Sequence, residues 1–155
     1  LPMPDCPLPP GVTLTNWQPE LADQFFQTYD AAFRERPGFP GYRSPTEWVD
    51  SWTNDHFRPE WSLLARTGDV PLGFLTATAN PPNGFVMQVG VIPTQRRRGL
   101  SSGLIVEAMR QMQADGAASA QLTVHVNNPG AIHAYDKLGF ATIGRRARYE
   151  RIATQ

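Results

Sequence analysis

The segment from residue 85 to residue 126 constrains the fold more than any other part of the chain. Residues 85 to 92 are mostly apolar, and Pro93 ends this strand pattern because proline cannot donate to a strand ladder. Apolar side chains then recur at helical spacing up to about Gly116, at Leu100, Leu104, Ile105, Ala108, Met109 and Met112. Residues 120 to 126 alternate between apolar and polar. This strand, helix, strand order predicts a crossover between two parallel strands.

The remaining elements are read from local patterns. A strand is expected over 12–17, a helix over 19–34, and a shorter helix that Ser44 caps and that runs through Trp52. Strands over 61–66 and 72–78 flank a turn at Gly68-Asp69, and residues 80–84 form the next turn. The order predicts an α+β fold with a mixed, mostly antiparallel sheet.

A last helix is expected to begin at Asn128, with Pro129 in its first turn. Gly139 then closes this helix in a left-handed conformation. Residues 140 to 152 are expected to return as one or two strands.

Size and composition limit the classes of function. A chain of 155 residues fits one domain, here predicted over 12–155 after a proline-rich arm over 1–11. The formal net charge of zero excludes nucleic acid and anionic membranes as partners of the whole chain. The single cysteine, Cys6, allows no internal disulfide and favours a cytoplasmic location, and no stretch has the roughly 18 apolar residues of a membrane span. The first residue is not methionine, which suggests a trimmed or excised chain.

Positive charge gathers where the long helix begins. Arg96, Arg97 and Arg98 precede Gly99, which lets the main chain approach a ligand closely, and the hydroxyls of Ser101 and Ser102 follow. The unpaired amides and dipole of a helix start favour an anion. No nucleotide-triphosphate loop or dinucleotide fingerprint is present. The junction therefore indicates either a diphosphate site that needs no metal or a solvated helix start without a ligand.

Two motifs resemble the signatures of the GCN5-related N-acetyltransferases. Arg96-Arg-Arg-Gly99-Leu-Ser101 is similar to their coenzyme A pyrophosphate loop, Gln/Arg-x-x-Gly-x-Gly/Ala, with serine in place of the last glycine or alanine. Residues 128–140 are similar to their second signature, Asn-x-x-Ala-x-x-x-Tyr-x-x-x-Gly-Phe. The resemblance implies the GNAT fold, a three-layer arrangement with a central parallel strand pair and helices on both faces. It also implies acetyl-coenzyme A as cosubstrate and no metal.

The resemblance also implies roles for individual residues. Main-chain groups of Val89 and Val91 would bond the pantetheine arm between two splayed parallel strands. Leu100 belongs to the pyrophosphate loop, and Asn128 and Ala131 belong to the second signature, where Asn128 is a helix cap, a cofactor contact or both. Tyr135 would protonate the departing thiolate, since its phenol is neutral at pH 7. Without the motif, core packing would be the favoured explanation, because Ile132, Tyr135 and Leu138 share a helical face.

The sequence does not assign a general base. Many family members carry a carboxylate on the strand before the loop, but that strand here contains Val86, Met87 and Gln88. The alternatives considered are Asp30, Glu35, Asp55, His56, Glu60 and His125. A water chain, or an acceptor of low pKa, would need no dedicated base.

The expected activity is acyl-coenzyme A-dependent N-acetylation of a primary amine on a small molecule or peptide. Aromatic side chains near the loop over 34–41 are candidates to line the acceptor pocket, and the proline and glycine content of this loop is typical of a substrate gate. The alternative is a non-catalytic coenzyme A-binding or regulatory module. It is suggested by the missing strand carboxylate and by the resemblance of the first part of the chain to halves of two-domain members related to mycothiol synthase. A homodimer or a partner domain of the same family is the expected protein partner.

Overall fold

Five strands form a single mixed sheet in the order β1-β2-β3-β4-β5. The first three strand pairs are antiparallel, and β4 and β5 are parallel. The strands are β1 (Thr13–Asn16), β2 (Leu63–Thr67), β3 (Val70–Asn80), β4 (Asn83–Val91) and β5 (Ala120–Leu122). The mixed sheet and its parallel pair confirm the expected fold class.

This computed structural model describes residues 3–35, 41–123 and 129–144. The chain divides into two units, residues 1–123 and residues 124–155. The sheet belongs to the first unit, and each unit is described by itself.

Two tight turns connect the antiparallel strands β2, β3 and β4. Gly68 adopts a positive φ of 59° in the tight turn between β2 and β3, where glycine is favoured. Asn80 pairs with Asn83 at the turn between β3 and β4, and the Pro81–Pro82 peptide bond between them is cis. β2 begins two residues later than expected because Pro59–Trp61 forms the short 3-10 turn η2.

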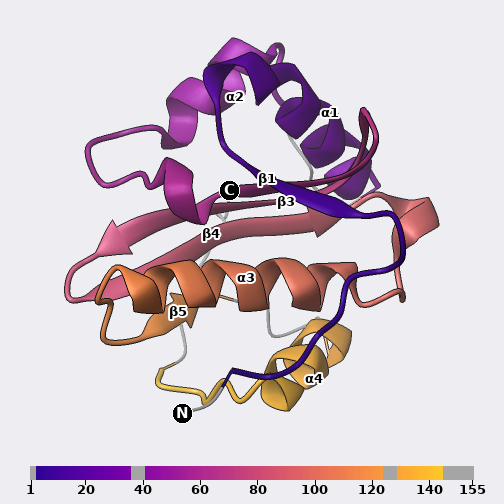
Figure 1. The fold of residues 1–155 in the computed structure, drawn as a ribbon. Coiled ribbons are helices and arrows are strands. Elements are labelled where there is room, and N and C mark those ends of the chain that lie inside the picture. Colours follow the sequence, from indigo (N-terminus) through magenta and orange to yellow (C-terminus); the bar gives the residue numbers. More distant parts are fainter. Residues whose placement is uncertain (1–2, 36–40, 124–128, 145–155) are drawn as a thin grey trace, which may run out of the picture. The chain divides into compact units, whose positions relative to one another are not determined.

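Two helices cover one face of the sheet (Figure 1). The predicted helix over 19–34 is the 3-10 turn η1 (Pro19–Leu21) followed by α1 (Ala22–Phe33), and α2 spans Pro45–Trp52. Aromatic side chains fill the space between these helices and the sheet. Tyr29 stacks on Trp48 at 4.7 Å between ring centroids, and Phe74 of β3 meets the edge of both rings. This aromatic layer fixes α1 and α2 on the sheet.

One long helix, α3 (Leu100–Ala114), lies on the other face (Figure 1). Its predicted apolar stripe is buried, and glycines let it approach the strands closely. A Cβ added at Gly73 would lie 3.3 Å from side-chain atoms of Leu100 and Leu104. At Gly84 it would lie 2.5 Å from the sulfur of Met112. Helices therefore cover both faces, as expected.

The proline-rich start of the chain contacts α3. Residues 3–9 contain no helix or strand, and Leu8 reaches Gly103, where an added Cβ would lie 2.6 Å from Cδ2 of Leu8. Cys6 is half-buried, and its carbonyl oxygen also approaches Gly103. The boundary between arm and domain at residue 11 stays a prediction.

The second unit contains α4 (Pro129–Lys137), which agrees with the predicted last helix. Gly139 ends it with a φ of 90°, as expected for a left-handed cap. The predicted strand over 140–152 is wrong for residues 140–144, which are described and contain no strand. Residues 145–152 lie outside the described part of the chain, as does Asn128.

Candidate functional site

The site is built where β4 loses its neighbour on one side. β5 pairs with β4 only from Gly84 to Val86, although β4 continues to Val91 and pairs with β3 to its end. Among the described residues, the edge of β4 from Met87 onwards therefore has no strand partner on the β5 side. Val89 and Val91 lie in this stretch, and the predicted second strand is described only up to Thr123.

A β-bulge marks the point where the parallel pairing stops. Gln88 pairs with Thr76 and Val86 pairs with Ala77, so that Met87 is an extra residue on β4. A bulge of this kind bends its strand and increases the local twist. The bend comes directly after Val86 and Leu122, the last parallel pair among the described residues.

The loop after β4 leads into α3 through two left-handed residues. η3 (Pro93–Gln95) is followed by Arg97 with φ 65° and Gly99 with φ 79°. Gly99 is the N-cap of α3, where no side chain of the described residues caps the helix. An added Cβ at Gly99 would meet nothing within 4 Å, so the positive φ rather than crowding favours glycine here. The first amides of α3 are left available to a ligand.

A cavity of about 200 Å³ lies at this junction. Its lining contains Val91, Gln95, Arg96, Arg97, Gly99, Leu100, Ser101 and Ser102. The structure thus brings together most of the predicted loop residues, while Val89 and Arg98 do not line the cavity. None of the described residues that line it carries a carboxylate, and the helix start adds positive potential. Both features fit the diphosphate of coenzyme A.

The lining residues contribute in different ways. Leu100 is 2% exposed and packs against β3, so that only its main chain can face a ligand. Ser101 and Ser102 are half-buried and lie in the first turn of α3. Arg98 donates from Nη1 to Oε1 of Gln95 at 2.8 Å. Arg96 donates from Nη2 to the Ala32 carbonyl oxygen at 2.8 Å, and from Nε to that of Val91 at 3.3 Å.

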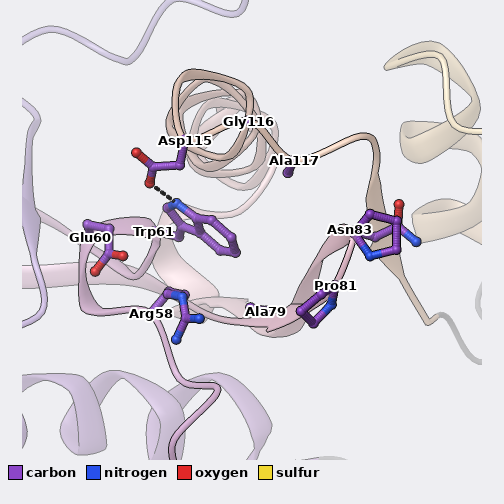
Figure 2. Close-up of a pocket in the computed structure, with 10 residues that line it drawn as sticks. Arg58, Glu60, Trp61, Ala79, Pro81, Asn83, Asp115, Gly116 and Ala117 are labelled. Carbon is purple, nitrogen blue, oxygen red and sulfur yellow. Dashed lines mark hydrogen bonds between the residues drawn. The ribbon is translucent and has the colours of Figure 1, made fainter.

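A larger cavity of about 340 Å³ has the opposite electrostatic character (Figure 2). It lies beside the C-terminal end of α3, where the carbonyl end of the helix carries negative potential. Asp115 accepts a hydrogen bond from Nε1 of Trp61 at 2.6 Å, and Glu60 adds a second carboxylate. Arg58, 5.9 Å from the centroid of the Trp61 ring, is the only described cation in the lining. These charges disfavour a diphosphate despite the larger volume.

The second unit explains the spacing of the second motif. The amide of Phe140 donates to the Tyr135 carbonyl at 3.1 Å, and the amide of Gly139 donates to that of Asp136 at 3.0 Å. These two bonds form a Schellman motif, and the rings of Tyr135 and Phe140 lie 6.1 Å apart across it. Burial raises the pKa of the Tyr135 phenol above its usual 10.0, which keeps it protonated at neutral pH. Ala131 is half-buried in the same helix.

The strand that often carries the family's base presents no carboxylate here. Val86 is buried, Met87 packs against the aromatic layer, and Oε1 of Gln88 is buried without a partner among the described residues. The alternatives considered from the sequence are mostly at the surface. Asp30 forms an ion pair with Arg34, while Glu35, Asp55, His56 and Glu60 are exposed and His125 lies outside the described residues. The base stays unassigned.

Two contributions to the site were missed from the sequence. Gln95 lines the cavity and accepts from Arg98, and Arg96 bonds a helix 64 residues earlier in the chain. The bond from Arg96 has no local sequence signal, because it depends on where α1 ends in the fold, whereas the contact between Gln95 and Arg98 joins residues three apart in one loop. Within the described residues, no group of three His, Cys, Asp or Glu side chains could hold a metal ion, and no helix is long and apolar enough to cross a membrane.

The sequence pattern of the Acetyltransferase (GNAT) family matches residues 22–140. A mycothiol acetyltransferase of Paenarthrobacter aurescens (strain TC1) is 32% identical over 146 residues, which cover 89% of this chain and 45% of that protein. The chain thus spans about half the length of the curated relatives that it matches.

Solved structures share the fold. A GCN5-related N-acetyltransferase from Sphaerobacter thermophilus is similar with a TM-score of 0.72 and 24% identity, over 90% of this chain and 44% of that one. The aminoglycoside N-acetyltransferase AAC(6')-Iy in complex with CoA has a TM-score of 0.71 and 18% identity, over 92% of this chain and 95% of that one. At these identities, the similarity establishes the fold alone.

Proposed function

Because this chain belongs to the Acetyltransferase (GNAT) family, we propose that it transfers an acetyl group from acetyl-coenzyme A to a primary amine of a small molecule or peptide. The observation that carries the proposal is the cavity at the start of α3. There, a left-handed Gly99, uncapped helix amides and two lining arginines converge, with no carboxylate among the described lining residues. These groups suit a diphosphate and need no metal to bind it.

Acetyl-coenzyme A would supply the thioester, and the chain would hold and orient it. The amides of Leu100, Ser101 and Ser102 would receive the diphosphate, Arg97 in the lining would offset its negative charge, and Arg98 beside the cavity would add positive potential. Main-chain groups of Val89, on the edge of β4 that has no strand partner among the described residues, would form hydrogen bonds to the pantetheine arm. The Val91 carbonyl already accepts from Arg96, so the Val91 amide is the group that we assign to the arm.

The transfer itself would be direct. The amine nitrogen forms a bond to the acyl carbon, the carbon–sulfur bond breaks, and the sulfur takes a proton from the Tyr135 phenol. The nitrogen loses one proton to water, and the phenolate regains a proton from water, so that one amide and one thiol are formed. The phenol is protonated over the whole neutral range, as a proton donor must be. Asn128 and Ala131 are proposed as cofactor contacts on the strength of the second motif alone.

The names of relatives favour a small acceptor. Curated relatives are called mycothiol acetyltransferases, and two similar structures are aminoglycoside N-acetyltransferases. Another similar structure is a ribosomal-protein-S18-alanine N-acetyltransferase, which keeps a peptide amine among the candidates. We therefore place small-molecule amines first, peptide amines second, and a cytoplasmic location with both.

A second candidate function is a coenzyme A-binding half without catalysis. Two observations favour it: the chain covers only 45% of a curated relative's length, and β4 presents Val86, Met87 and Gln88 where a base would be useful. In that case a partner domain of the same family would carry the chemistry. Coenzyme A would bind, but no acceptor would be acetylated.

Calorimetric titration with coenzyme A and with pantetheine, which lacks the diphosphate, tests the site. Ser101→Glu places a carboxylate in the first turn of α3, where the helix dipole tolerates it and folding is retained. Repulsion of about 1 to 3 kcal/mol per phosphate charge at roughly 6 Å should weaken coenzyme A binding at least tenfold. The matched control is Gln27→Glu, the same charge change at an exposed position of α1. Equal affinity of both variants would refute the diphosphate site.

Turnover separates the two functions. Incubation with acetyl-coenzyme A and a panel of aminoglycosides, amino sugars and lysine peptides is followed by thiol release and by the mass of acetylated product. Product from any acceptor supports catalysis, and Tyr135→Phe should then lower turnover without weakening coenzyme A binding. Coenzyme A binding with no product across the panel would favour the non-catalytic half.

A further inference from the structure

Arg96 is the only one of the three loop arginines whose guanidinium bonds, within the described residues, to an element outside its own loop and strand. Its Nη2 donates to the Ala32 carbonyl oxygen at 2.8 Å, in the last turn of α1. Its Nε donates to the Val91 carbonyl oxygen at 3.3 Å, at the end of β4. Arg98, in contrast, donates to Gln95 within the loop. The side chain of Arg96 thus joins three segments: the loop, the end of β4 and the end of α1.

The contact suits the end of a helix. The last four carbonyls of a helix have no partner within it, and the dipole places negative potential there. A guanidinium satisfies both requirements with a charge-assisted hydrogen bond. Arg96 therefore acts as a cationic cap on α1 that the loop after β4 supplies.

Close packing next to this bond makes the connection stiff. Gly90 lies on β4 below the last turn of α1, and an added Cβ there would lie 3.0 Å from Cβ of Ala32 and 3.3 Å from a ring carbon of Phe33. Helix and strand are nearly in contact at this point, so the end of α1 cannot shift without disturbing β4 or the Arg96 bond. Arg96 also lines the cavity that we assign to the diphosphate.

We propose that Arg96 is a positioning residue that couples occupancy of the loop to the C-terminal end of α1. The inference depends on the proposed function, because it requires coenzyme A to bind at this cavity. A ligand that holds the loop also holds the backbone of Arg96, and so fixes the guanidinium against Ala32. Such coupling is reciprocal, so that an ordered end of α1 also favours the loop conformation that binds coenzyme A. The other two arginines would act on the diphosphate by charge alone.

Hydrogen exchange read by mass spectrometry tests the coupling, with coenzyme A itself as the probe. In the wild-type chain, saturating coenzyme A should slow amide exchange over residues 30–35 on the order of fivefold or more, the low end of typical coupling between sites. Arg96→Gln should abolish this difference. Arg96→Lys, which keeps one charged donor, should retain part of it. Arg97→Gln is the matched control: it should weaken binding yet keep the full protection of residues 30–35 once coenzyme A saturates.

Each result decides the matter. Protection of residues 99–102 by coenzyme A reports binding at the loop. Its absence in the wild-type chain would refute the proposed function rather than the coupling. Protection of 99–102 without any change over 30–35 would overturn the inference, as would equal coenzyme A-dependent protection in Arg96→Gln. A merely structural Arg96 would change exchange in the free chain but not the difference that coenzyme A makes. If Arg96→Gln does not fold, undiminished protection in Arg96→Lys overturns the inference, and reduced protection supports it.

Discussion

Gly90 is the position where a single methyl group should most disturb the scaffold of the site. A Cβ there would lie 2.8 Å from Cε1 of Phe74 and 3.0 Å from Cβ of Ala32, whereas carbon atoms pack best at about 3.5 to 4.0 Å. Phe74 is fully buried among aromatic rings and has little room to turn. The Cβ of Ala32 is fixed to the backbone of α1. The helix must therefore move away from β4 by roughly 0.5 to 1 Å.

Overpacking of this kind lowers the free energy of unfolding by about 1 to 3 kcal/mol. Alanine offsets up to about 1 kcal/mol of this loss, because glycine is unfavourable within a strand. We expect Gly90→Ala to destabilise the chain by about 1 to 2 kcal/mol, which lowers Tm by roughly 2 to 8 °C for a chain of this size. Thermal unfolding followed by circular dichroism measures the shift.

The matched control is Gly103→Ala, whose Cβ would come even closer to a neighbour, 2.6 Å from Leu8 Cδ2. That atom is the tip of a flexible side chain in a segment without helix or strand, and alanine is favoured over glycine within a helix by about 1 kcal/mol. Gly103→Ala should therefore leave Tm unchanged or raise it. If Gly90→Ala unfolds at the wild-type temperature or above, the contact between α1 and β4 is not rigid, and the reasoning on Gly90 fails.

Two further predictions concern a cap and a titration. Ser44 accepts from the Glu47 amide at 3.1 Å, so Ser44→Ala should cost about 1 kcal/mol in urea unfolding, and an unchanged midpoint would contradict the cap. Burial raises the pKa of Tyr135, so the folded chain holds this proton more tightly than the unfolded chain, and stability should fall as pH rises above 10.0. The free energy of unfolding of Tyr135→Phe should fall less steeply with pH, by a difference of at most about 1.4 kcal/mol per pH unit. Denaturant titrations from pH 9 to 11.5 measure both slopes. Identical slopes would count against burial of the phenol.

Periodicity predicted most of the fold because each element carries its own pattern. The stripe from Leu100 to Met112 needs only local spacing, and Gly68 and Gly139 mark turns that require a positive φ. The bulge at Met87 could not be predicted, since it depends on the register with β3 rather than on the identity of the residue. The prediction of a strand after Phe140 is wrong for residues 140–144. The apolar residues there are not sufficient to form a strand.

The candidate site was predictable where main chain and charge determine it. Gly99 and the residues that begin α3 lie together because they are neighbours in sequence. Long-range contacts were not predictable: the bond from Arg96 to Ala32 exists only because α1 ends above the end of β4. The roles of Asn128 and Tyr135 come from a motif, and the Schellman geometry gives an independent structural reason for part of its spacing.

The extra residue in β4 has a consequence for engineering. Among the described residues, the surplus residue at Met87 lies where β4 stays paired with β3 while its described pairing with β5 ends. A substitution that changes only the side chain of Met87 should leave this pairing pattern unchanged. Deleting this one residue would remove the bulge from β4. The arginines and serines of the loop would remain in the sequence.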